Sequence, residues 1–142
     1  MNHRRRKKLT RRLFEAIWEG DAARVGAALR TGADPNRPDR DGVTPLYEAA
    51  VNGRAEAARL LLAAGARPDT ESDGMPGADG TPLCAAACWG HTGTVRALLA
   101  HGADPDLRED QGAGRSPLDW ALDGGHPDTA ALLRAAGATS AL

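Results

Sequence analysis

Apolar residues recur along the chain at the spacing of one face of a helix. In three segments that each close at a glycine, the residues seven, four and three positions before that glycine are apolar: Val25, Ala28 and Leu29; Ala58, Leu61 and Leu62; Val95, Leu98 and Leu99. Residues at this spacing share a helical face, so each segment is predicted to be an amphipathic helix. A fourth segment reads Ala130, Leu133 and Arg134, and its final charge suits a terminal helix whose outer side meets water.

The glycine that closes each segment begins a repeated phrase. Gly-Ala recurs at Gly32, Gly65, Gly102 and Gly137, at intervals of 33, 37 and 35 residues. A second marker keeps nearly the same interval, and its copies are Thr44-Pro45-Leu46, Thr81-Pro82-Leu83 and Ser116-Pro117-Leu118. A period in this range is typical of stacked arrays, in which no unit buries its apolar face without a neighbour. The repeat therefore directs the search for function to a binding surface.

Each unit of the array is predicted to be a pair of helices. The pairs are expected at about 10–18 with 22–30, 45–52 with 55–64, 82–89 with 92–101, and 117–124 with 127–136. A Thr or Ser hydroxyl caps the first helix of the last three pairs, and the proline that follows stands where no N–H is needed. The first helices are expected to end at glycines in the left-handed conformation, namely Gly20, Gly53, Gly90 and Gly125.

These motifs resemble the ankyrin repeat most closely in the third unit. That unit reads Gly80-Thr81-Pro82-Leu83-Cys84-Ala85-Ala86-Ala87-Cys88-Trp89-Gly90-His91, followed by Val95, Leu98, Leu99 and Gly102-Ala103-Asp104. The resemblance covers about residues 10 to 140 and implies an all-α solenoid of four helix-turn-helix units with projecting hairpin loops. It implies repeats at about 10–42, 43–79, 80–114 and 115–142, in a small stand-alone array of a bacterial type. The sequence departs from the family pattern at Tyr47, Cys84 and Asp119, where the family usually has His.

Two of the loops between units are longer than the family's ordinary spacing. The segment from Gly32 to Thr44 has that spacing, whereas the loops at 69–80 and 106–115 carry insertions of four and two residues. Insertions in a stacked array emerge as loops on one face, which is often the binding face. Neutral variation of the surface is the alternative explanation.

The net charge of −1 conceals a basic beginning and an acidic body. Residues 1–12 contain seven of the 18 Lys and Arg residues and none of the 19 acidic ones, which leaves 11 basic and 19 acidic residues in the body. Residues 1–9 are expected to form a flexible basic tail. The segment Arg4–Arg12 could attach to nucleic acid or an anionic membrane, although it lacks interleaved aromatics, and a solvated terminus is the simpler interpretation.

The sequence favours a cytoplasmic location. No apolar run approaches the ~18 residues of a membrane span. Thr10-Arg11-Arg12-Leu13-Phe14 briefly resembles a twin-arginine export signal, but charged residues interrupt the apolar stretch that must follow. Cys84 and Cys88 stand four residues apart on one predicted helix, where they are poorly placed for a disulfide across the fold.

Candidate catalytic and metal sites are weak. Cys84, Cys88 and His91 share one helical face and could hold zinc with His101, but His91 occupies a turn position that is part of the repeat. Two acidic pairs fall in turns, where Asp serves the backbone locally: Asp39 with Asp41, and Asp104 with Asp106. We expect no enzyme activity, no metal site and no cofactor.

The resemblance implies a concave groove lined by loop tips and by the exposed faces of the first helices. All three tryptophans fall on predicted first helices, and Trp is a frequent anchor at protein interfaces. An unknown protein is therefore the expected partner of a chain that is expected to be monomeric. The candidate partner-binding residues are Trp18, Arg40, Asp41, Val51, Asn52, Cys88, Trp89 and Asp123.

Overall fold

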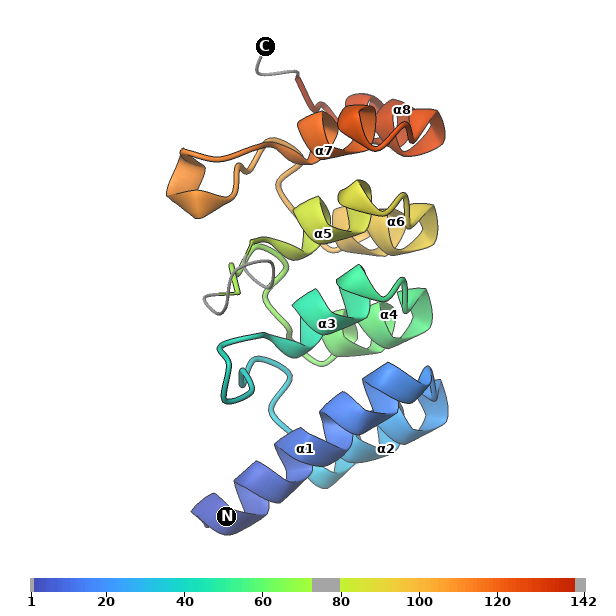
Figure 1. Ribbon diagram of the computed structural model, residues 1–142. Helices are drawn as coiled ribbons and strands as arrows, with labels where there is room; N and C mark the ends of the chain where they lie inside the picture. Colours follow the sequence, from blue (N-terminus) through green and yellow to red (C-terminus); the bar gives the residue numbers. More distant parts are fainter. Residues whose placement is uncertain (1, 73–79, 140–142) are drawn as a thin grey trace.

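The computed structural model describes residues 2–72 and 80–139, and within them the helices come in pairs (Figure 1). One 3₁₀ helix, η1 (Asp110–Gly112), lies in the loop before the last pair. The α-helices are α1 (His3–Glu19), α2 (Ala22–Thr31), α3 (Pro45–Val51), α4 (Ala55–Ala63), α5 (Pro82–Cys88), α6 (Thr92–Ala100), α7 (Pro117–Asp123) and α8 (Pro127–Ala135).

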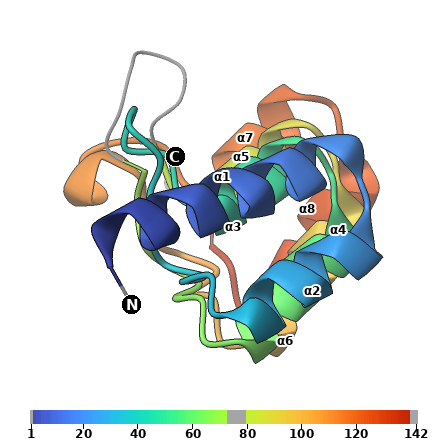
Figure 2. The same ribbon diagram turned by 90° about the horizontal axis from the view of Figure 1, so that it is seen from below.

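The pairs stack in chain order into a solenoid. The first helices α1, α3, α5 and α7 pack in one row, and the second helices α2, α4, α6 and α8 pack in a second row behind it. Viewed along the stack, the two rows lie side by side and the connecting loops project beyond one end of the first row (Figure 2). The predicted all-α solenoid is confirmed.

The first helices begin and end as their local chemistry predicts. Thr44, Thr81 and Ser116 each accept a hydrogen bond at the side-chain oxygen from the backbone N–H three residues on, over 3.1, 3.2 and 3.1 Å. A proline follows each cap, where the missing N–H has no consequence. The glycines after the first helices are left-handed, with φ of 69° at Gly20, 66° at Gly53, 69° at Gly90 and 72° at Gly125.

The second helices bury the apolar positions that the sequence pattern marks. The residues seven and four positions before each closing glycine are buried in all four units, and the fully buried ones include Val25, Leu61, Leu98 and Leu133. Full burial of such a side chain contributes roughly 1.5–3 kcal/mol relative to leaving it exposed. Arg134 is exposed, as expected for the last helix of a stack.

The segment 1–9, predicted to be a flexible basic tail, is helical in its described part from residue 3 onward. Residues 3–9 are the first turns of α1, and the side chain of Asn2 caps the helix by accepting from the Arg5 N–H over 2.9 Å. Two physical reasons explain this: Arg and Lys are good helix formers, and Leu9 lies on the same buried face as Leu13. The side chains of residues 3–8 are exposed.

Polar side chains in the loops tie each unit to the next. The Asn36 amide donates to the Gly65 carbonyl over 2.9 Å and accepts from the Arg67 N–H over 2.8 Å. Asp69 Oδ1 accepts from the Asp104 N–H over 3.0 Å, and Asp106 Oδ1 accepts from the Thr139 N–H over 2.8 Å. The same loop position therefore performs the same structural task along the stack.

The two longer loops differ in how much of them the structure describes. Most of the insertion predicted at 69–80, including Asp79, falls at residues 73–79, outside the described residues. Ser72 and Gly80, on either side of this gap, pair as an antiparallel bridge. The loop at 106–115 is described throughout its backbone and contains η1.

Candidate functional site

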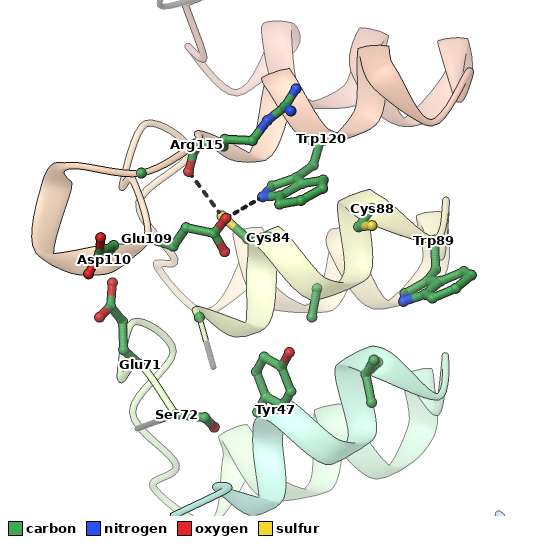
Figure 3. A pocket seen from close by; sticks show the side chains of 14 residues that line it. Tyr47, Glu71, Ser72, Cys84, Cys88, Trp89, Glu109, Asp110, Arg115 and Trp120 are labelled. Carbon is green, nitrogen blue, oxygen red and sulfur yellow. Dashed lines mark hydrogen bonds between the residues drawn. The ribbon is translucent and has the colours of Figure 1, made fainter. Parts of the chain in front are cut away.

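An open groove of about 850 Å³ lies across the last three units. Its walls come from the first helices α3, α5 and α7 and from the loops that precede α5 and α7 (Figure 3). We call the part near the interhelical turns, formed by Val51, Cys88 and Trp89, the turn end. The part near the loops, formed by Glu71, Glu109, Asp110, Arg115 and Trp120, is the loop end.

Trp89 dominates the turn end. It follows α5 directly as the C-cap residue, and the left-handed Gly90 comes next. The side chain is 62% exposed. Val51 and Cys88, at the ends of α3 and α5, are partly buried beside it. The turn end therefore offers an apolar surface that remains in contact with water.

The backbone at the turn end is fixed by contacts between neighbouring units. In the last three units, the residue after the left-handed glycine reaches back to a main-chain carbonyl near the end of the preceding first helix. Arg54 Nη2 donates to the Trp18 carbonyl over 2.8 Å, His91 Nε2 lies 3.3 Å from the Val51 carbonyl, and His126 Nε2 lies 3.0 Å from the Cys88 carbonyl. We call these three interactions the turn–carbonyl contacts; they hold the turns at a constant place in the stack.

At the loop end, Trp120 is held on two sides. Its indole N–H donates to Glu109 Oε1 over 2.7 Å. The Arg115 guanidinium carbon lies 4.7 Å from the centre of the Trp120 ring, a cation–π arrangement. Arg115 also pairs with the carboxylate of Asp123 on α7. Trp120 is therefore a fixed part of the groove wall.

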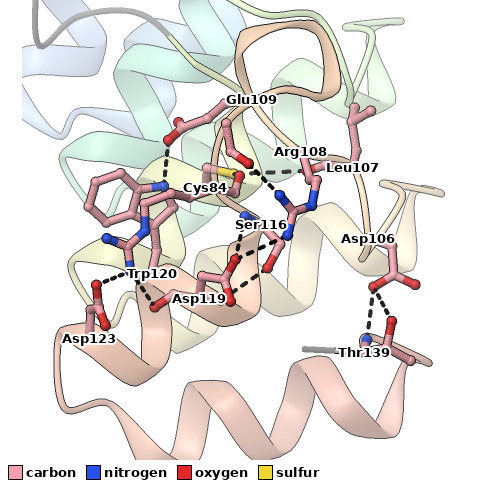
Figure 4. Close-up of polar contacts among 12 residues, drawn as sticks. Cys84, Asp106, Leu107, Arg108, Glu109, Ser116, Asp119, Trp120, Asp123 and Thr139 are labelled. Atoms are coloured by element: carbon pink, nitrogen blue, oxygen red, sulfur yellow. Dashed lines mark hydrogen bonds and ion pairs between the residues drawn. The ribbon is translucent and has the colours of Figure 1, made fainter. Parts of the chain in front are cut away.

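The loop that carries Glu109 and Arg115 is anchored to α7 (Figure 4). Ser116 and Asp119 form a capping box, in which each side chain accepts from the other residue's N–H over 3.1 Å. The buried Asp119 carboxylate also lies 3.6 Å from Arg108 Nη2, so the departure from the family's usual His provides a charge partner for the loop. Arg108 donates in turn to the Gly114 carbonyl over 2.8 Å.

Cys84 lies beneath the loop end and is 2% exposed. Its Sγ lies 3.7 Å from the Arg115 carbonyl and 4.0 Å from the Leu107 carbonyl. Burial raises the pKa of the Cys84 thiol to about 12, and the negative charge of Glu109 adds to the effect. Burial and Glu109 also raise the pKa of Cys88, in that order. Neither thiol is poised as a nucleophile, because both are shifted toward the neutral form.

The two acidic pairs form hydrogen bonds within their own turns. Asp39 Oδ1 accepts from the Asp41 N–H over 2.9 Å, and Asp104 Oδ1 accepts from the Asp106 N–H over 2.9 Å. Within residues 2–72 and 80–139, no three His, Cys, Asp or Glu side chains gather as they would to hold a metal ion. The same residues contain no helix long and apolar enough to cross a membrane.

The structure brings together three of the eight candidate binding residues. Val51, Cys88 and Trp89 line the groove, and the other five lie outside its lining. Asn52 donates to Glu48, and Trp18, 50% exposed, also donates to Glu48 over 2.7 Å. Asp123 is the ion-pair partner of Arg115.

Arg40 and Asp41 are exposed in the loop between α2 and α3, away from the groove lining. The predicted set also omitted Tyr47, Glu109 and Arg115, which do line the groove. The signals for them were present: Tyr47 replaces a family His, and the other two stand in the inserted loop. The sequence pattern does not predict that the loop at 106–115 returns over α5, which is what brings Glu109 and Arg115 to the groove.

Comparison with known proteins identifies the repeats. The family model described as ankyrin repeats (3 copies) matches residues 13–109 and 71–140. A putative ankyrin repeat protein of Fowlpox virus is 40% identical over 67 residues, which cover 46% of this chain and 15% of that protein. The mouse 2-5A-dependent ribonuclease is 44% identical over 57 residues, covering 39% of this chain and 8% of that enzyme.

A third relative is nearer to this chain in size. Protein phosphatase 1 regulatory subunit 27 of Mus musculus is 36% identical over 61 residues, covering 43% of this chain and 40% of that subunit. In each of these relatives the matched region is less than half of the protein. The repeat motifs, the stacked helix pairs and the family match agree, and the chain belongs to the ankyrin-repeat family.

Proposed function

We propose that this chain binds a partner protein through the groove across its last three units. Ankyrin repeats are protein–protein interaction modules and are generally non-catalytic. The observation that carries the proposal is Trp89, 62% exposed at the mouth of a groove. Such a residue is a strong interface anchor, because a partner that covers the indole gains most of its apolar area.

The rigidity of the surface also supports this function. The turn–carbonyl contacts fix the backbone on both sides of the turn end, and the capping box fixes the start of α7 at the loop end. A preformed surface spends little free energy on ordering when a partner binds. The proposed role is therefore recognition, with no chemical step assigned to the chain.

The proposal includes a monomer acting in the cytoplasm without enzymatic activity. Two observations support it: Cys84 and Cys88 are free thiols, as is common in reducing compartments, and the terminal helix α8 carries exposed charges at Asp128 and Arg134. Size-exclusion chromatography with light scattering measures the oligomeric state, and a stable dimer would contradict this part of the proposal.

Affinity capture from a nuclease-treated lysate tests the groove. Wild type is compared with Trp89→Ala/Val51→Arg in the groove and with the matched control Leu122→Ala/Ala100→Arg, two exposed positions outside its lining. A protein retained by wild type and the control, but lost from the groove variant, is the expected result. Equal retention by all three chains would refute the groove as the binding site.

A further variant tests the basic beginning of α1 as the attachment site. Replacing the exposed Arg4, Arg5, Lys7 and Lys8 with Gln keeps good helix formers and removes four charges. We expect this variant to retain the same protein. Loss of capture on this variant alone would move the function to a polyanion contact, which weakens steeply with salt.

A further inference from the structure

The two ends of the groove have different chemistry. The turn end is apolar, with Val51 and Trp89. The loop end carries three carboxylates, and in Figure 3 the side chains of Glu71 and Asp110 face one another across it, with Glu109 between them and Trp120. A partner that fills the whole groove therefore meets an apolar surface at one end and acidic groups at the other.

The balance of charge at the loop end is negative. Among the 14 described residues that line the groove, three are acidic and one, Arg115, is basic. The Arg115 guanidinium is engaged outside the lining by Asp123 and lies over the ring of Trp120. Glu109 raises the pKa of both Cys84 and Cys88, so its negative charge is felt along α5 toward the turn end.

The chain beyond residue 12 also carries a net negative charge. Beyond residue 12, 11 basic residues stand against 19 acidic ones. The seven basic residues of the first twelve lie on α1, and neither α1 nor α2 contributes to the groove lining. A partner that approaches the last three units therefore meets an acidic body, which attracts cations and raises their rate of encounter.

The Trp120 ring suits a long cationic side chain. Trp120 on α7 is partly buried in the groove wall, whereas Tyr47 on α3, on the other side of α5, is only 7% exposed. Lys and Arg pack their methylene stems along apolar surface while the charged head group stays with polar partners. Such a side chain can lie along the Trp120 ring with its head group at the carboxylates of the loop end.

We infer that the groove takes a segment of a partner protein that carries a Lys or Arg beside an apolar side chain. The cation lies at the loop end with Glu71, Glu109 and Asp110, and the apolar side chain lies on Trp89 and Val51 at the turn end. This inference rests on the proposed function and adds to it the chemistry and the orientation of the partner.

Peptide display tests the inference without a known partner. The probe is a phage library of random peptides of about a dozen residues, selected on the full-length chain and then counter-selected on Trp89→Ala/Val51→Arg. The expected result is a set of peptides that share at least one Lys or Arg near an apolar residue. Synthetic copies of the selected peptides then provide defined ligands for calorimetry.

Charge variants assign the cation to the loop end. Glu71→Gln/Asp110→Asn removes two charges, and Asn suits the φ of 54° at position 110. The matched control Glu56→Gln/Asp128→Asn removes two exposed charges on α4 and α8. We expect the peptides to bind the groove variant about tenfold more weakly and the control within about twofold. Replacing the peptide's own cation with Gln should abolish the difference.

Two outcomes distinguish a failure of the cationic-segment inference from a failure of the proposed groove binding. Peptides that need Trp89 and Val51 but are acidic, uncharged or insensitive to Glu71→Gln/Asp110→Asn would overturn the inference and leave the proposed function standing. A selection that returns no peptide dependent on Trp89 and Val51 would overturn both.

Discussion

The loop end and the turn end of the groove hold their tryptophans in opposite ways. At the loop end, the Trp120 N–H donates to Glu109 and a guanidinium lies over the ring. At the turn end, Trp89 is 62% exposed, and the hydrogen bonds and ring contacts described for residues 2–72 and 80–139 include none from its indole. The comparison shows that one end is a fixed wall, whereas the other presents apolar area that a partner can still cover.

The largest expected effect concerns the backbone beneath the turn end. In Gly90→Ala the new Cβ would lie 2.5 Å from His126 Nδ1, at a φ of 69° that disfavours L side chains. We expect a loss of about 3 kcal/mol, from backbone strain and displacement of the imidazole that contacts the Cys88 carbonyl. Urea unfolding measures it.

Gly102→Ala is the matched control, because its φ is also positive, at 89°, but nothing lies within 4 Å of the new Cβ. Its expected loss is only about 1–2 kcal/mol, the cost of the left-handed backbone. Equal losses in the two variants would show that the imidazole contact contributes nothing to holding the turn.

Truncating the two tryptophans tests the comparison directly. Trp120→Ala removes a partly buried ring and leaves Glu109 without its indole donor, so we expect a loss of about 2 kcal/mol in unfolding free energy. Trp89→Ala removes mostly exposed area and should cost less than about 0.5 kcal/mol. Thermal and urea unfolding of both variants measure the difference; a larger loss for Trp89→Ala would reverse the comparison.

Raising the pH should destabilise the loop end through Cys84. Its folded pKa of about 12 lies above the ordinary 9.0, so the fold favours the neutral thiol. That contribution is complete below pH 9 and is lost as the pH rises from 9 toward 12, at up to about 1.4 kcal/mol per pH unit.

The measurement compares wild type with Cys84→Ala by urea unfolding at pH 8 and pH 10.5, with reductant present. Wild type should lose more stability than the variant over this interval. Parallel losses would mean that the Cys84 thiol titrates normally in the fold. Cys88 is present in both chains, so its own titration cancels from the comparison.

The smallest expected effect concerns the thiol at the turn end. Cys88 is partly exposed and should react with iodoacetamide at pH 8, whereas the buried Cys84 should react only after unfolding. Glu109→Gln removes a negative charge that raises the pKa of Cys88, so its alkylation should become about twofold faster. Glu56→Gln is the control; an equal acceleration there would remove Glu109 as the cause.

Local chemistry explains which features the sequence predicted. Helix caps such as Thr81 and left-handed glycines such as Gly90 depend on residues within a few positions. The predicted helix boundaries therefore agree with those of the structure to within one or two residues, apart from the start of α1. The exposure of Trp89 agrees with its place before such a glycine. The repeat provides this information several times over, which strengthens the prediction of the fold.

The loop end could not be predicted because it depends on contacts between units. Glu109 meets Trp120 only because the loop at 106–115 returns over α5, held by Arg108 and the buried Asp119. Nothing in the repeat pattern encodes that path. Trp18 shows the converse: the repeat places it at a groove position, but its unit lies outside the groove and its N–H is bonded to Glu48.

The turn–carbonyl contacts have a consequence for how such a chain can diverge. Each one ends on a main-chain oxygen, which any amino acid provides, at positions that carry Trp18, Val51 and Cys88. The side chains at these positions can therefore be exchanged without losing the bond that joins the units. Substitutions at the turn end, natural or engineered, can therefore change which partner it recognises while the turn–carbonyl contacts between units are kept.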